Sequence, residues 1–120
     1  AEVLFQPSLL GLEQREAIHT TLLDVIAKCD LDLHRVLYSS VMLSGGSSMF
    51  PGLEQRLAAE MRARVPPMMA SHVKVLAPPG RKYAVWRGGA VLASLDTFAQ
   101  SCVSRERYEE EGPDIVHQRL

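Results

Sequence analysis

Residues 41–52 read VMLSGGSSMFPG, an apolar run that stops at glycines and serines before a helical pattern resumes at Leu53. This order predicts a strand, a turn whose backbone can closely approach another group, and the N-terminus of a helix. Helix N-termini present unpaired N–H groups and the positive end of a dipole, which suit phosphate or ribose oxygens. A plain strand-to-helix connection also needs glycine for a positive φ, and glycine pairs are common there. The segment alone leaves both interpretations open.

The composition is that of a globular protein, since 47% of the 120 residues are hydrophobic and 22% are charged. The net charge of −1 creates no field that favours nucleic acid or an acidic membrane, so neither is expected as a direct partner. Cys29 and Cys102 do not form a CxxC pair, which favours a reducing intracellular compartment. The chain starts on Ala1 and is apolar from Val3 onward, so we expect it to be part of a larger protein.

Hydrophobic periodicity predicts helices over residues 12–28, 53–65 and 88–95, a shorter helix after Asp30, and a helix over 105–110 that Ser104 caps. The same patterns predict strands over 41–43 and 73–76, a loop over 68–71 and a tail over 115–120. Two or three strands are too few for a well-covered sheet. We therefore expect residues 1–120 to form a single partial domain, one part of an α/β layer.

The sequence offers no catalytic or metal-binding set. Ser44, Ser47 and Ser48 do not satisfy the Gly-x-Ser-x-Gly pattern of hydrolases, and no Gly-Lys-Ser/Thr follows the glycines as a P-loop requires. The four histidines are scattered without a zinc-like spacing. Asp30 and Asp32 lie between two predicted helices, where carboxylates usually act as caps. We therefore expect no enzymatic activity from this segment.

Several segments in a fixed order resemble the C-terminal third of actin and the actin-related proteins. They are Leu4-Phe5-Gln6-Pro7-Ser8, Lys28-Cys29-Asp30-Leu31-Asp32, residues 43–52, Ala77-Pro78-Pro79, Arg81-Lys82-Tyr83, Trp86 with Gly88-Gly89, Leu92-Ala93-Ser94-Leu95, and Gly112-Pro113 with Ile115-Val116-His117. Each segment is short and weak evidence by itself, but all of them together, in the order found in the family, are specific for it. The resemblance extends from Glu2 to the end of the chain.

The resemblance implies an incomplete α/β fold of the actin-like ATPase type, which is ribonuclease H-like and related to Hsp70 and hexokinase, with helices packed on part of a mixed sheet. It also implies ATP or ADP with a divalent cation, Mg or Ca, bound only in the context of the full-length fold. The positions that match the family's nucleotide pocket are Gly45, Gly46, Ser47, Met49, Phe50 and Lys82, and the resemblance implies that Lys82 lies near the adenine side. The residue types agree, because glycine lets a backbone approach, Met and Phe supply apolar walls, and Lys supplies charge.

The resemblance also places the family's phosphate-gripping hairpins, metal-proximal aspartate and water-orienting residues upstream of this segment. Arg87 replaces an aliphatic residue beside the family's barbed-end groove, which disfavours the docking of apolar helices there. The implied function is that of a divergent actin-like cytoskeletal structural protein of the cytoplasm, with actin-like subunits and actin-binding proteins as partners. The alternative is a nuclear actin-related subunit of a chromatin-modifying complex that uses nucleotide structurally.

Overall fold

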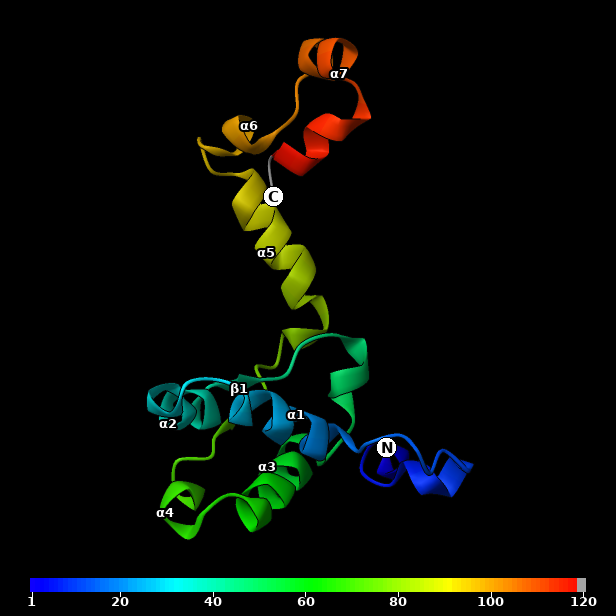
Figure 1. Cartoon of the computed structure of the whole chain (residues 1–120), viewed down its shortest axis with the longest axis vertical. Helices are drawn as coiled ribbons and strands as arrows, with labels where there is room; N and C mark the ends of the chain where they lie inside the picture. The colour runs from blue at the N-terminus through cyan, green and yellow to red at the C-terminus, as the bar shows by residue number, and fades with distance from the viewer. Residues whose placement is uncertain (119–120) are drawn as a thin grey trace. The chain divides into compact units, whose positions relative to one another are not determined.

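The computed structural model describes residues 1–118, and the chain divides into two compact units at the bond between Val85 and Trp86. The first unit contains η1 (Glu2–Leu4), η2 (Pro7–Leu10), α1 (Ile18–Ala27), α2 (Leu31–Ser39), β1 (Val41–Met42), η3 (Gly46–Met49), α3 (Leu53–Arg64), α4 (Pro67–Ala70), β2 (Val75–Leu76) and η4 (Arg81–Tyr83), where η denotes a 3-10 helix. Helix α5 (Ala84–Ala93) crosses the division, and α6 (Phe98–Ser101), α7 (Arg105–Glu111) and η5 (Pro113–Gln118) follow (Figure 1).

Strands β1 and β2 form a two-stranded parallel sheet in which Val41 lies opposite Val75 and Met42 opposite Leu76. The N–H of Leu43 donates to the carbonyl of Leu76 at 2.8 Å and extends the pairing by one step. Within the described residues, the expected mixed sheet is present only as this parallel pair. Parallel strands need a crossover connection, and η3, α3 and α4 form it here.

The core of the first unit forms where α1, α2, α3 and β2 meet. Leu53, Leu57 and Met61 recur every four residues and therefore lie on one face of α3. Leu57 and Met61 are at most 1% exposed. Further buried residues of this core come from the N-terminal segment and from the other elements: Phe5, Ile26, Tyr38, Ala58, Val65, Val73 and Val75.

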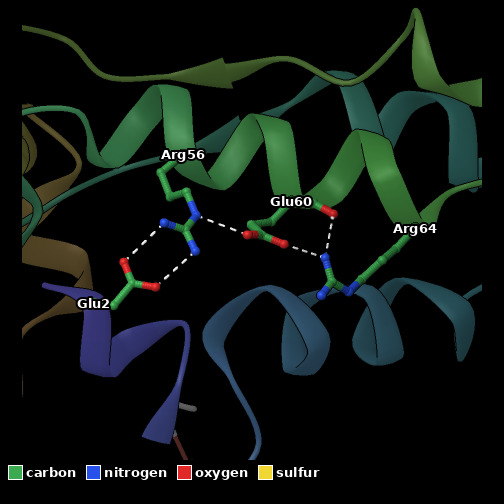
Figure 2. Close-up of polar contacts among 4 residues, drawn as sticks. All are labelled: Glu2, Arg56, Glu60 and Arg64. Carbon is green, nitrogen blue, oxygen red and sulfur yellow. Dashed lines mark hydrogen bonds and ion pairs between the residues drawn. The ribbon is translucent and has the colours of Figure 1, made fainter. Parts of the chain in front are cut away.

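A chain of ion pairs joins the N-terminal segment to α3 (Figure 2). The two terminal nitrogens of Arg56 donate to the two carboxylate oxygens of Glu2, each at 2.9 Å, and its Nε donates to Glu60 at 2.9 Å. Arg64 donates to the other oxygen of Glu60. These hydrogen bonds lower the pKa of Glu60, and the bond from Arg64 has a larger effect than the bond from Arg56. Because exposed pairs contribute little energy each, their effect is mainly to orient η1 on α3.

His19 is buried in this unit, and only 3% of it is exposed. Its ring stacks on that of Phe5 with centroids 5.8 Å apart, and its Nδ1 makes no hydrogen bond within the described residues. Burial is the largest cause that lowers the pKa of His19, followed by the positive charge of Arg64, while the Glu60 carboxylate opposes the shift. The fold therefore favours the neutral imidazole.

Some predicted boundaries and elements were wrong. The helix predicted over 12–28 begins only at Ile18, because residues 13–16 are polar and only the later positions face the core. The segment 68–71, predicted as a loop, largely forms the short helix α4, since Pro67 suits the first position of a helix. The predicted tail includes η5, in which Ile115 is fully buried; residues 119–120 lie outside the described residues.

In the second unit, Ser104 caps α7 as predicted, because its Oγ accepts a hydrogen bond from the N–H of Arg107 at 3.3 Å. Helix α5 contains no buried residue, and the space beside Gly88 and Gly89 is open. No helix among the described residues is long and apolar enough to cross a membrane.

The core packing predicts that replacing Met61 destabilises the protein far more than replacing Met68. Met61→Ala should lower the free energy of unfolding by about 2–5 kcal/mol, because it leaves a cavity at a fully buried site. Met68→Ala is the matched control: 75% of Met68 is exposed, so the change should have little effect. Urea unfolding followed by far-UV circular dichroism measures both. Equal losses for the two variants would contradict this description of the core.

His19 predicts a pH dependence of stability. Its pKa in the folded state lies below the ordinary value of 6.5, so the unfolded chain binds the proton at higher pH. The stability from this site is complete above about pH 6.5 and is lost as the pH falls toward the lower folded-state pKa, by at most about 1.4 kcal/mol per pH unit. Glu60, whose pKa is lowered from 4.5, stays ionised between pH 5.5 and 7.5.

The measurement compares the wild type with His19→Phe by urea unfolding at intervals between about pH 5.5 and 7.5. The variant keeps a planar ring beside Phe5 but has no proton to bind, so its stability should fall less than that of the wild type. Parallel curves for the two proteins would show that His19 is not responsible.

Candidate functional site

The loops that follow the two strands meet at one edge of the sheet. Because β1 and β2 are parallel, both carboxyl ends lie at the same edge, where open α/β sheets bind ligands. The loop after β1 leads into η3, and the turn at residues 77–80 after β2 leads into η4. Elements η3 and η4 are in contact. Segments more than thirty residues apart in the sequence therefore form one surface.

Gly45 determines the conformation of the first loop. Its φ of 89° and ψ of 164° lie in a region that is essentially restricted to glycine. Its N–H donates to the carbonyl of Arg81 at 2.9 Å. Its own carbonyl accepts from the N–H of Ser48 at 3.2 Å and from Ser48 Oγ at 2.7 Å. The turn is thus closed by hydrogen bonds around the buried Ser48.

The guanidinium of Arg81 connects the two loops. On one side, Nε lies 3.2 Å from Ser48 Oγ and Nη2 lies 3.1 Å from the Ser48 carbonyl. On the other side, Nη1 donates to the carbonyls of Ala77 and Pro78, each at 3.2 Å. The loop after β1 is therefore held to the loop after β2 by one side chain.

The structure places all the predicted nucleotide-contacting residues on this pair of loops. Gly45 precedes η3, Gly46, Ser47 and Met49 form part of it, Phe50 follows it, and Lys82 is the middle residue of η4. Met49 is 41% exposed and Phe50 is 47% exposed. Gly46, Ser47 and Lys82 are exposed as well. The Lys82 ammonium lies 5.1 Å from the centre of the Tyr83 ring. Gly45 is half-buried, and the other five residues are exposed on two elements that are in contact.

The surroundings of the glycines leave room for another group. A Cβ built on Gly45 or Gly46 meets no atom of the described residues within 4 Å apart from its chain neighbours. The hydroxyl of Ser47 and the ammonium of Lys82 are of the kind that bind phosphate or ribose oxygens, and the exposed Met49 and Phe50 offer apolar surface to a planar base. Ser47 also lines a mainly apolar hollow of about 300 Å³ with Leu43 and Leu53. The residue types present therefore fit a nucleotide.

The family model of Actin matches residues 1–120 of the sequence. The chain belongs to the actin family. Membership implies the actin-like ATPase fold, and the described residues of this actin-family chain are mostly helical with a small parallel sheet.

Reasoning from the sequence assigned no role to Arg81 or Ser48, although both lie in segments that resemble the family. Arg81 follows a turn and stands next to Lys82, so its sequence context resembles that of any surface arginine. Its contact with Ser48 spans 33 residues. The spacing of residues in the sequence does not encode such a contact. The contact forms only because the ends of β1 and β2 lie at the same edge of the sheet.

The structure offers no cation site among the residues that it describes. No three His, Cys, Asp or Glu side chains of residues 1–118 lie together in a way that could hold a metal ion. Among the described residues of this actin-family chain, the groups that suit a nucleotide are the Ser47 hydroxyl, the Lys82 ammonium and the apolar side chains of Met49 and Phe50.

The backbone conformations of Gly45 and Gly46 predict that an alanine substitution has opposite effects on stability at the two positions. Gly45→Ala should lower the free energy of unfolding by about 1–3 kcal/mol, because the backbone there is strained for any residue with a Cβ. Gly46→Ala is the matched control: its φ is not positive and its surroundings are open. It should be neutral or stabilise the chain by up to about 1 kcal/mol, because alanine restricts the unfolded chain.

Thermal and urea unfolding of the two variants checks this prediction. If Gly45→Ala were as stable as Gly46→Ala, the left-handed backbone of the turn would not be a requirement of the fold.

Proposed function

We propose that Gly45, Gly46, Ser47, Met49, Phe50 and Lys82 form one wall of an ATP or ADP cleft in an actin-like cytoskeletal structural protein. The observation that supports this most is the exposed face at the carboxyl edge of the strands, where open space at Gly45 and Gly46 adjoins both polar and apolar side chains. A plain connection between a strand and a helix needs a positive φ at Gly45, but it does not need an open glycine at position 46 or two exposed apolar residues after it.

Each residue of the wall has a chemical role in this proposal. The open backbone at Gly46 lets the nucleotide approach, and the Ser47 hydroxyl is available to phosphate or ribose oxygens. Met49 and Phe50 cover an apolar part of the ligand. Lys82 supplies a positive charge on an apolar stem.

We infer that the opposing wall belongs to polypeptide outside this chain. Five of the six residues are exposed, and a small-molecule site normally encloses most of its ligand. The groups that bind the divalent cation and orient a water molecule for hydrolysis would belong to the same outside polypeptide. In this proposal the chain itself binds one side of the nucleotide and performs no hydrolysis.

Actin-like subunits and actin-binding proteins are the proposed partners, and the cytoplasmic cytoskeleton is the proposed location. Family membership supports an actin-like protein, and the nuclear actin-related subunit is the alternative. Purification of the protein with its partners provides the test. Recovery of actin-like subunits and actin-binding proteins is expected, whereas recovery of chromatin-modifying subunits would overturn the cytoskeletal assignment.

The nucleotide assignment is tested at Gly46. In the protein at its full natural length, Gly46→Val should weaken ATP binding at least about tenfold, or about 1.4 kcal/mol, as measured by calorimetry. A Cβ at this position meets no atom of the described residues within 4 Å beyond its chain neighbours, so the loss is expected from crowding of the ligand rather than of the fold. The smaller Gly46→Ala should cause a smaller loss, and unchanged affinity for both variants would refute the assignment.

Lys82 and Lys74 provide a matched pair of substitutions that tests the role of the positive charge in ATP binding. Lys82→Met should weaken ATP binding and reduce its dependence on salt, because it removes one positive charge from a site that binds an anionic ligand. Lys74 is also exposed, but it precedes β2 and so lies at the opposite end of the strand. Lys74→Met should bind ATP as the wild type does, and an equal loss in both variants would argue against a specific role for Lys82.

A further inference from the structure

We propose that Arg81 is a positioning residue for this site: its side chain fixes the loop after β1 against the loop after β2, so that Gly46, Ser47 and the backbone that carries Lys82 are held in one preorganised arrangement for the nucleotide. The inference rests on the proposed function, because it concerns how the same nucleotide-facing surface is built.

The first observation is that one residue holds the glycine turn at both ends. The carbonyl of Arg81 accepts from the N–H of Gly45 at 2.9 Å, where the turn begins. Its side chain donates to the carbonyl and to the hydroxyl of Ser48, where the turn closes. Gly46 and Ser47 lie between these two anchors. Their position relative to η4 therefore follows from the conformation of Arg81.

The second observation is the placement of Lys82. It is the next residue in the chain after Arg81 and shares the short 3-10 helix η4 with it. The hydrogen bonds of Arg81 to Ala77 and Pro78 hold η4 against the end of β2. The residue that fixes the glycine turn therefore also fixes the backbone that carries the Lys82 ammonium.

The third observation is electrostatic. Arg56, Arg64, Arg105 and Arg107 each form an ion pair with a glutamate. The hydrogen-bond partners of Arg81 within the described residues are all neutral carbonyl and hydroxyl oxygens. No described carboxylate pairs with its charge. Arg81 and Lys82 thus leave adjacent positive charge at this edge, which favours an anionic ligand.

Arginine suits this role better than lysine. A planar guanidinium presents donors in several fixed directions, so it can contact two loops at once, whereas a lysine ammonium is a single point of charge. Arg81→Lys therefore keeps the charge and removes the connection between the loops. Arg81→Met removes both.

The test measures ATP affinity by calorimetry at two salt concentrations in the protein at its full natural length. Arg81→Lys should bind ATP at least about tenfold more weakly than the wild type and keep the wild-type salt dependence. Arg81→Met should bind more weakly still and show a smaller salt dependence. If Arg81→Lys binds ATP as the wild type does, charge alone is sufficient and the positioning role is refuted.

Ser48→Ala provides a second, milder variant, because it removes the hydroxyl acceptor and keeps the carbonyl. It should weaken ATP binding less than Arg81→Lys does. The double variant should lose no more than Arg81→Lys alone if the two residues act through the same contact. Losses that simply add would contradict the proposal.

The Gly46→Val variant separates the two proposals. If Gly46→Val weakens ATP binding while the Arg81 variants bind normally, the nucleotide wall stands and the positioning role fails. If the wild type binds no ATP, or Gly46→Val binds it normally, the proposed function itself fails.

Discussion

The parallel pairing of Val41–Met42 with Val75–Leu76 is the constraint on which the rest of the first unit depends. A parallel pair cannot be closed by a tight hairpin, so the chain must cross over between the strands, and α3 lies in that crossover. The crossover places the apolar face of α3 in the core. Because the strands are parallel, their carboxyl ends also lie at the same edge of the sheet, where η3 and η4 are in contact.

The arginines of this chain serve two different purposes. On α3, Arg56 and Arg64 pair with glutamates at the surface, and Arg56 also lies 4.9 Å from the centre of the Phe5 ring. These contacts orient the N-terminal segment on a core that hydrophobic burial stabilises. Arg81 instead binds backbone oxygens of two loops. Its effect is on the geometry of a surface rather than on the packing of helices.

Helix α5 differs from the helices of the core because its own contacts stabilise it little. Val85 and Trp86 are 79% and 74% exposed, and Val91 is 63% exposed. Burying one such side chain contributes about 1.5–3 kcal/mol, and the described residues do not supply that contribution here. The space beside Gly88 and Gly89 of this helix is open among the described residues.

The sequence by itself determined the elements whose signals are local. The four-residue spacing from Leu53 to Met61 specifies α3, Ser104 specifies the start of α7, and Gly45 specifies a turn that only glycine adopts readily. Family membership was also readable, because many short segments occur in the right order and a family model matches the whole chain. Only the tertiary structure decided that the strand pair is parallel, that His19 is buried with no partner for Nδ1 among residues 1–118, and that Arg81 joins the two loops. Those features depend on contacts between segments far apart in the chain, and neither periodicity nor spacing encodes which distant residue will lie opposite.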